Sequence, residues 1–270
     1  MAKHPVKKFR KSGPAAKKSL NWLWGRSSVF GTVNSGRWRV YELFVTSEVY
    51  DQNVRILTVQ KANGIELEVV SNDKLSELCQ ATDHQGIVAR VSKYPYDTLE
   101  NFENAFLASD TALPSAVKPI AVVMDRIQDT FNFASLLRSC DHAGVGFVFV
   151  GEHCQSQVTT QVARLCSGAV NHLSIVQSSE LQVTAKRLKE LGLTLIAADP
   201  SSSQSVDSAV LDGPLGFLVG SDLSGLDPNL MALSDQRVCI PGSSHSTLLS
   251  PSVSTGVLLY ETRRRQRLGS

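Results

Sequence analysis

The sequence predicts an α/β protein whose C-terminal part holds a mostly parallel β-sheet, preceded by a smaller α/β domain. Helical patterns separate four apolar segments beyond residue 117: "PIAVVMD", "GFVFVG", "LTLIAAD" and "LGFLVG". Each segment is apolar almost throughout instead of alternating with polar residues, which indicates strands covered on both faces. A chain of 270 residues, 42% of them apolar, can bury a substantial core and divide into two domains.

Residues 1–26 are expected to form a basic, disordered arm. They contain eight lysines and arginines and no acid, so the remaining residues carry 27 − 8 = 19 basic and 25 acidic side chains, a net charge of −6. Polyanion binding is one interpretation, because basic side chains release counterions from a phosphate backbone. A merely solvated tail is the alternative. An organellar transit peptide is a third interpretation, although Pro5, Gly13 and Pro14 interrupt any amphipathic helix.

Residues 27–95 are predicted to form the small α/β domain. Its expected strands are "RVYELFVT", "ILTVQ", "GIELEVV" and "GIVARV", and "SNDKLSELCQA" is expected to be a helix capped by Ser71 or Asn72. Residues 96–117 suit a helix followed by a linker, because the segment is first acidic and then rich in small residues and proline. The second domain is therefore expected at 118–270. At its end "TRRRQR" forms a second basic cluster, expected to be a tail with the same two interpretations as the arm.

Composition limits the classes of function. No run approaches eighteen apolar residues and the N-terminus lacks the apolar core of a secretory signal, so a cytoplasmic protein without a membrane span is expected. The cysteines are odd in number, scattered and without a C-x-x-C pair, which favours reduced thiols over disulfides or a metal site. They are Cys79, Cys140, Cys154, Cys166 and Cys239.

A first polar loop and helix follow the strand that ends at Asp125. The helix is expected to begin at Asn132, a residue type that caps helices well. One face is apolar and predicted to be buried, comprising Phe133, Leu136, Leu137 and Cys140. The other face is polar and comprises Ser135, Arg138, Ser139 and His142. Taken alone, these residues also fit a capping asparagine and a solvated arginine.

Two further loops follow predicted strands. In "LVGSDLSGLD", Gly220 permits a close backbone approach and Gly225 a turn, although a tight turn capped by Asp222 or Ser224 explains the loop equally simply. In "VCIPGSSHSTLLSPSVS", Ser250 can cap a helix that has Pro251 at its first position. Val253, Val257 and Tyr260 are expected to form the buried stripe of that helix. All three loops lie at the carboxyl edge of the sheet, where parallel sheets bind ligands.

Together the three segments resemble the motifs of the SpoU family of RNA ribose 2′-O-methyltransferases, of the SPOUT superfamily. "DTFNFASLLRS" is similar to D-P-x-N-x-G-A-x-x-R-[ST], and "LVGSDLSGL" to G-x-E-G-x-G-[LM]. "IPGSSHSTLLSPSVSTGVLLYE" is similar to I-P-M-x-G-x-x-x-S-L-N-V-S-x-A-x-x-x-x-x-E. "HQGIVARV" resembles the end of the family's small N-terminal domain, so the likeness covers about 84–268 and is weaker over 27–83.

The resemblance implies a C-terminal trefoil knot, a homodimer, and S-adenosylmethionine bound without a metal. The implied cofactor contacts are Ala198, Gly220, Ile240, Leu248 and Leu249. The implied catalytic residues are Asn132, Arg138, Asp222 and Ser250. The substrate would be RNA, most closely a guanosine of large-subunit ribosomal RNA. The arm would then contact RNA through Lys7, Lys8, Arg10, Lys11, Lys17 and Lys18.

The sequence also departs from the family motifs. Thr130 replaces a proline, Ala134–Ser135 a Gly-Ala pair, Asp222 a glutamate, and Ser250 and Pro251 an Asn-Val pair. These departures keep open a second hypothesis, a non-catalytic RNA-binding relative that acts in ribosome assembly. A dinucleotide-dependent enzyme fits less well, because the "GVG" at 144–146 precedes a strand and completes no G-x-G-x-x-G.

Overall fold

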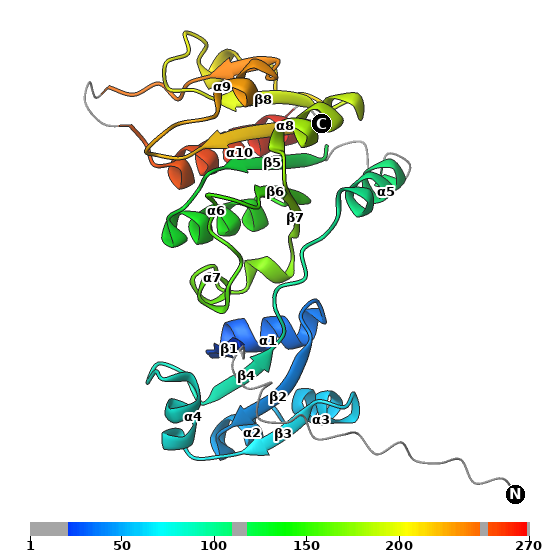
Figure 1. Cartoon of the computed structure of the whole chain (residues 1–270), viewed down its shortest axis with the longest axis vertical. Helices are drawn as coiled ribbons and strands as arrows, with labels where there is room; N and C mark the ends of the chain where they lie inside the picture. Colours follow the sequence, from blue (N-terminus) through cyan, green and yellow to red (C-terminus); the bar gives the residue numbers. More distant parts are fainter. Residues whose placement is uncertain (1–20, 110–117, 244–247, 269–270) are drawn as a thin grey trace, which may run out of the picture.

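The computed structural model describes residues 21–109, 118–243 and 248–268. It contains two sheets, one in each half of the chain (Figure 1). The small sheet has four strands in the order β1-β4-β2-β3, and the large sheet has six in the order β10-β8-β9-β5-β6-β7. The predicted pairing of a small α/β domain with a parallel α/β domain is confirmed.

The small domain differs from the prediction in two places. Residues Asn21–Trp24 form β1, antiparallel to β4, so the domain begins inside the range expected to be the arm. The segment "ILTVQ", predicted as a strand, is part of α3, where only Leu57 is fully buried. A short apolar run fits a strand or a helix, and here the residues from Val54 to Ala62 form a single helix.

The predicted strands β2 (Val40–Val45), β3 (Glu66–Val69) and β4 (Ile87–Val91) and the predicted helix α4 (Asn72–Cys79) occur in the expected order. Two helices, α1 (Arg26–Ser35) and α2 (Ser47–Gln52), were not predicted, and α3 spans Val54–Ala62. Ser71 caps α4 by accepting a hydrogen bond from the Lys74 N–H at 3.3 Å, as predicted.

Every strand pair of the large sheet is parallel. Its strands are β5 (Ile120–Asp125), β6 (Phe147–Gly151), β7 (Ser174–Ser178), β8 (Thr194–Ala198), β9 (Leu215–Gly220) and β10 (Gln236–Val238). The helices of this half are α5 (Leu99–Ser109), α6 (Thr130–His142), α7 (Thr160–Leu165), η2 (Ala169–Asn171), α8 (Leu181–Glu190), η3 (Val206–Ser208), α9 (Pro228–Ala232) and α10 (Pro251–Leu268).

Helices cover both faces of the large sheet, as the continuous apolar strands predict. On one face Val122 and Met124 of β5 belong to a core that includes α6 and α10. On the other face Ala121 and Val123 belong to a core that includes α5, α8 and α9. The predicted buried face of α6 is confirmed, because Phe133, Leu136, Leu137 and Cys140 are each inaccessible to solvent.

The C-terminal arginines are part of α10 and not of a basic tail. Arg263 donates hydrogen bonds to the carbonyls of Ala143 and Gly144 at 2.7 and 2.8 Å, just beyond the end of α6. Arg265 donates to the carbonyl of Ala209 at 2.8 Å and pairs with Glu261. Cationic side chains satisfy carbonyls at helix ends, so two arginines of the cluster stabilise the fold.

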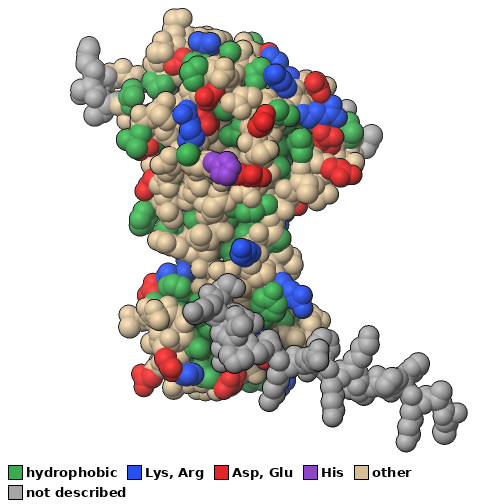
Figure 2. Space-filling model, viewed as in Figure 1, with side chains coloured by type: hydrophobic (Ala, Val, Ile, Leu, Met, Phe, Trp, Pro, Cys, Tyr) green, Lys and Arg blue, Asp and Glu red, His purple; other side chains and the backbone are tan. Residues whose placement is uncertain are grey.

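Polar contacts join the two domains at a narrow waist, visible in Figure 2, beside an apolar core that both domains share. Thr32 and Ser35 of α1 donate to the Asn171 side-chain oxygen at 3.3 and 3.4 Å. The guanidinium of Arg164 in α7 lies 3.9 Å from the centre of the Trp24 ring and pairs with Asp83 of the small domain. These contacts fix how the small domain sits on the large one.

Candidate active site

Three of the predicted cofactor residues lie at neighbouring ends of parallel strands. Ala198 ends β8 and pairs with Val238 of β10, and Gly220 ends β9 beside Asp125 at the end of β5. Ile240 follows β10 and packs half-buried against the core. The strand order therefore brings together residues that are more than forty positions apart in the chain, such as Ala198 and Ile240.

Gly220 lies where the backbone folds back on itself. A Cβ at this position would meet the carbonyl carbon of Gly225 and the nitrogen of Leu226, both at 2.2 Å. Gly225 has φ = +64°, which glycine adopts without strain, and its N–H donates to the carbonyl of Ser221 at 2.9 Å. The expected close approach at Gly220 is made by the chain's own backbone.

A chain of hydrogen bonds joins three of the four predicted catalytic residues. The Asn132 amide donates to the Asp222 carboxylate at 3.4 Å, and the Asn132 side-chain oxygen accepts from the Ser252 hydroxyl at 3.4 Å. The hydroxyls of Ser252 and Ser250 lie 3.0 Å apart. The network connects α6, the loop after β9 and the start of α10. Ser252 was not predicted, although it is the last serine of the motif "SPS".

Asn132 does not cap α6, contrary to the prediction. The helix begins at Thr130, and the Asp129 carboxylate accepts a hydrogen bond from the Asn132 N–H at 2.7 Å. Aspartate caps helices as well as asparagine does, and Asp129 stands three residues before Asn132. Because Asp129 satisfies the backbone, the Asn132 side chain is available to the site.

The alternative prediction for the loop after β9 was a tight turn capped by Asp222 or Ser224. Asp222 and Ser224 lie in a turn, and the next helix, α9, is capped by Asp227. Ser250 does meet the expectation of a cap, because its hydroxyl accepts from the Val253 N–H at 3.4 Å and α10 begins at Pro251.

Arg138 lies on the exposed face of α6, two turns after Asn132. Within the described residues its guanidinium has no hydrogen-bond or ion-pair partner. An arginine in this state can bind a phosphate without breaking an existing pair.

The predicted buried stripe of α10 is exposed instead. Val253, Val257 and Tyr260 are 51%, 37% and 64% exposed, while Leu258, Leu259 and Thr262 are buried. The exposed residues line a hollow of about 500 Å³ together with Ser135, Ser139, Ser252 and Gly256. The prediction chose the wrong face of the helix, because Leu258 and Leu259 form a second apolar stripe on the same helix.

Sequence reasoning missed the role of Asp125 and Arg126. Asp125 is buried, and its carboxylate accepts from Arg126 at 3.0 Å and from the Asp227 N–H at 2.8 Å. The Arg126 guanidinium also donates to the carbonyl of Gly225 at 3.4 Å, and its backbone has φ = +57°. The pair ties the end of β5 to the loop that carries Asp222. The only signal in the sequence is an Asp-Arg pair directly after an apolar strand.

The remaining predicted contacts lie at or beyond the rim of the site. Leu248 and Leu249 precede α10 and are 75% and 49% exposed. The basic residues predicted to bind RNA, from Lys7 to Lys18, lie outside the described residues. Among the described residues no group of histidine, cysteine or acidic side chains could hold a metal ion, and no described helix could span a membrane.

Comparison with known proteins gives a consistent result. The sequence profile of the SpoU rRNA methylase family matches residues 119–260, and the profile named "RNA 2′-O ribose methyltransferase substrate binding" matches residues 22–97. The first covers more than half of the chain. The second begins at residue 22, which agrees with β1 as the start of the small domain.

Individual relatives match over nearly the whole chain. A putative TrmH family tRNA/rRNA methyltransferase of Bacillus subtilis is 27% identical, covering 91% of this chain and 96% of its own length. The 23S rRNA (guanosine-2′-O-)-methyltransferase RlmB of Shewanella oneidensis is 28% identical, covering 93% and 99%. The crystal structure of an AdoMet-bound rRNA methyltransferase from Sinorhizobium meliloti has the same fold, with a TM-score of 0.75 at 18% identity, covering 91% and 87%.

Proposed function

The chain belongs to the SpoU rRNA methylase family, and from this premise we propose that it methylates a ribose 2′-hydroxyl of RNA with S-adenosylmethionine. The observation that carries the proposal is the hydrogen-bonded chain from Asp222 through Asn132 to Ser252 and Ser250, while Arg138 lies exposed on the same helix as Asn132. Relatives named as 23S rRNA guanosine methyltransferases support large-subunit ribosomal RNA as the substrate and a guanosine as the target. They also support the expected cytoplasmic location.

The residues around the carboxyl edge suit an adenosine. Gly220 ends β9 at this edge, Ile240 is half-buried, and the exposed Leu248 and Leu249 would lose water-accessible apolar surface against a base. S-adenosylmethionine supplies a methyl group that its sulfonium makes electrophilic. The trefoil knot that the family implies would hold the loop beside Gly220, and it remains a prediction that the strand order does not test.

The protein's own side chains would align the ribose and stabilise its charge. Asn132, held from both sides by Asp222 and Ser252, is fixed in orientation and suits a role in orienting the ribose. Arg138 would hold the adjacent phosphate, because a guanidinium is a fork of donors that stays charged. Arginine hardly deprotonates in proteins, so it would position and stabilise, and the hydroxyl proton would leave through the substrate phosphate.

We also propose that the protein is a homodimer through α6 and α10. The support is the exposed apolar stripe of Val253, Val257 and Tyr260, which lies in a hollow beside the exposed face of α6. Monomeric proteins seldom leave such a stripe uncovered when its rim is polar. Arg138 on the same face would then act next to the cofactor of the second subunit.

Methyl transfer from labelled S-adenosylmethionine to in vitro transcribed large-subunit ribosomal RNA tests the proposal. The wild-type protein should transfer label to a 2′-hydroxyl. Asn132→Asp, which places a carboxylate beside Asp222, should slow single turnover about a hundredfold, or about 2.7 kcal/mol. Asn229→Asp makes the same change on an exposed position of α9 and should retain activity. RNA binding without transfer by the wild type would favour the non-catalytic assembly factor.

A further inference from the structure

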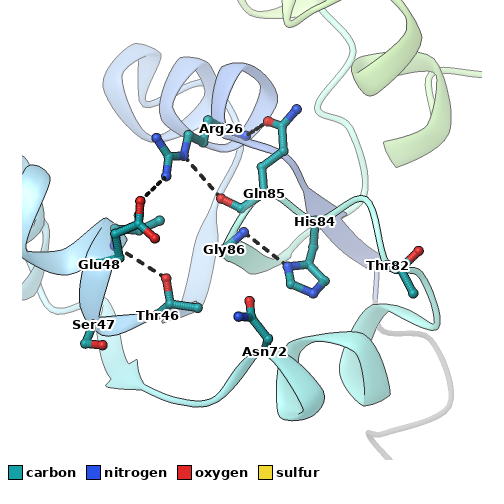
Figure 3. Close-up of a pocket in the computed structure, with 10 residues that line it drawn as sticks. Arg26, Thr46, Ser47, Glu48, Asn72, Thr82, His84, Gln85 and Gly86 are labelled. Atoms are coloured by element: carbon teal, nitrogen blue, oxygen red, sulfur yellow. Dashed lines mark hydrogen bonds and ion pairs between the residues drawn. The ribbon is translucent and has the colours of Figure 1, made fainter.

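The small domain has a pocket of its own, far in sequence from the catalytic motifs (Figure 3). Its volume is about 700 Å³, within the range of pockets that bind small ligands. The pocket lies where β1, β2 and β3 end and β4 begins. Its lining is mostly polar and consists of Arg26, Thr46, Ser47, Glu48, Val49, Asn72, Thr82, His84, Gln85 and Gly86.

Three of the lining side chains can bind a ligand without giving up another partner. Within the described part of the chain, the side chains of Ser47, Asn72 and Thr82 make no hydrogen bond, and all three residues are exposed. Figure 3 shows the Asn72 amide pointing toward Thr46 and Gly86, with Ser47 and Thr82 at opposite ends. An amide and hydroxyls both donate and accept, so they can read the hydrogen-bonding edge of a nucleobase.

His84 is structural and does not serve the ligand. Its Nδ1 accepts from the Gly86 N–H at 3.1 Å, and its Nε2 lies 3.1 Å from the Ser76 hydroxyl. Both ring nitrogens therefore have partners within the protein, and the residue is 5% exposed. It fixes the loop 82–86 that forms one wall.

Among the described residues that line the pocket, Arg26 is the only cation. It reaches Glu48 at 3.9 Å, with side-chain exposures of 43% and 75%, and donates to the Gln52 side chain and the Gln85 carbonyl, each at 3.2 Å. An exposed ion pair of this length contributes little free energy. A phosphate can therefore replace Glu48 as the partner of Arg26 at small cost, and a bidentate contact would be stronger than the pair it replaces.

The wall of the pocket is also fixed relative to the methyltransferase domain. Asp83 accepts from the Trp24 ring N–H at 2.8 Å and pairs with Arg164 of α7. A Cβ on Gly86 would lie 2.7 and 2.8 Å from the side chains of Val49 and Thr46, so the loop packs tightly on the opposite wall. In Figure 1 the part of the small domain that carries α4 and the carboxyl edge of the large sheet both lie on the left. One RNA can thus reach both sites.

We propose that this pocket binds one unpaired nucleotide of the RNA substrate, with its phosphate on Arg26 and its base against Asn72 and Thr82. The proposal rests on the proposed function and adds a specificity site to it. RNA is the occupant because the matched profile of this domain is one for substrate binding. Sequence-specific RNA recognition uses unpaired bases that are splayed into protein pockets, and the volume is too large for a phosphate alone.

Filter binding and single-turnover methyl transfer test the pocket, with the full-length protein and in vitro transcribed large-subunit ribosomal RNA. Arg26→Gln should weaken RNA binding at least fivefold, and Asn72→Ala at least threefold. Glu48→Gln, which frees Arg26, should tighten binding. Arg55→Gln is the matched control, because it removes the same charge from an exposed position on α3 of the same domain. Calorimetry with S-adenosylmethionine should give the same affinity for all four variants.

The outcomes separate the pocket from the proposed function. Equal RNA affinities for Arg26→Gln and Arg55→Gln, in a protein whose wild type transfers methyl groups, overturn the pocket and leave the function intact. A wild type that transfers no methyl group, while Arg26→Gln alone weakens RNA binding, overturns the function and retains the pocket. Thermal unfolding of each variant shows whether any loss of affinity reflects loss of the fold, and Glu48→Gln requires a gain that misfolding cannot produce.

Discussion

At the scale of single residues, Ser250 is the position where the sequence departs most informatively from the family motif. Its hydroxyl contacts both the Ser252 hydroxyl and the Val253 N–H, so it belongs to the site and to the helix cap together. Ser252 in turn holds Asn132. A change at Ser250 can therefore affect Asn132 through one intermediate side chain.

We expect Ser250→Asn to reduce methyl transfer modestly. Asparagine caps helices about as well as serine, so stability should change little. The residue before a proline is confined to extended backbone, which limits the directions in which the asparagine amide can point. The larger amide would also displace Ser252. Single-turnover transfer and cofactor affinity on one RNA measure the effect. A gain of tenfold or more, about 1.4 kcal/mol of barrier, would instead identify the natural sequence as an impaired enzyme.

Residue identities in the site were predictable to different degrees. Asn132, Asp222 and Ser250 were predicted from motif spacing, and the structure places them in one network. Their partners were not predictable, because a hydrogen bond to Ser252 depends on how α10 approaches α6. Arg126 was not predictable either, because its role depends on a left-handed backbone that sequence patterns rarely indicate for arginine.

At the scale of elements, α10 combines a buried stripe, an exposed apolar stripe and a set of internal salt bridges. The sequence predicted its start at Pro251 correctly. The faces were not predictable, because apolar residues at both stripes satisfy a helical period. In the small domain the prediction of a strand for "ILTVQ" was wrong for a related reason, because a short apolar run fits a strand or a helix.

The exposed stripe leads to a prediction about assembly. Val257→Asp places a charge in the hollow between α6 and α10 and should convert the dimer to a monomer, measured by light scattering at micromolar concentration. Val183→Asp is the control, since Val183 is similarly exposed on α8 but lies away from the hollow. A wild-type protein that is monomeric at this concentration would contradict the proposed dimer.

Glu261 should make the stability of α10 depend on pH. Hydrogen bonds from Arg264 and Arg265 lower the pKa of Glu261 from 4.5 to about 2. A carboxyl with a depressed pKa stabilises the fold fully above its unfolded pKa, and this contribution is lost as the pH falls toward the folded pKa. Glu261→Gln should therefore reduce the free energy of unfolding by about 1–2 kcal/mol at pH 7.

The difference between Glu261→Gln and wild type should be constant above about pH 5 and shrink steadily between 4.5 and 2. Urea unfolding at several pH values measures it. Glu77→Gln removes only an exposed pair with Lys74 and should change stability by a few tenths of a kcal/mol. A pH-independent difference for Glu261→Gln would show that its ion pairs do not contribute to stability.

At the scale of the whole molecule, the basic residues that could attract RNA are concentrated in particular segments of the chain. The chain beyond residue 26 carries a net charge of −6. On the face shown in Figure 2, acidic and basic side chains are interspersed over the large domain. We therefore expect general attraction to a polyanion to come largely from the N-terminal arm, because Arg263 and Arg265 of the C-terminal cluster bind backbone carbonyls of the fold.

Deletion of residues 1–20 should weaken RNA binding and reduce its salt dependence while cofactor affinity stays the same. The deletion removes seven basic residues. If each contacted a phosphate, the slope of log K against log salt would fall by roughly six, and partial contacts should give a smaller change. Filter binding from 50 to 200 mM salt is the measurement. An unchanged slope would rule out the arm as an RNA contact.

The two-domain organisation was predictable, and the docking of the domains was not. Apolar strand patterns indicated each sheet separately, although the buried residues of the two domains join into one core cluster. The contacts across the waist involve Thr32, Asn171 and Arg164, polar residues whose pattern resembles any surface helix. These side chains acquire their hydrogen-bond and ion-pair partners only when the two domains meet in the folded protein.

The contacts between the two domains restrict how the protein can evolve by recombination. Asn171 is buried, and its side-chain oxygen accepts hydrogen bonds from the hydroxyls of Thr32 and Ser35 of the other domain. A small domain exchanged from a distant homologue would leave that amide, and the Arg164 guanidinium, without their partners. New RNA specificity is therefore acquired more readily by point changes inside the resident small domain than by swapping the module. Paralogues of this chain should share waist residues even where their pocket residues diverge.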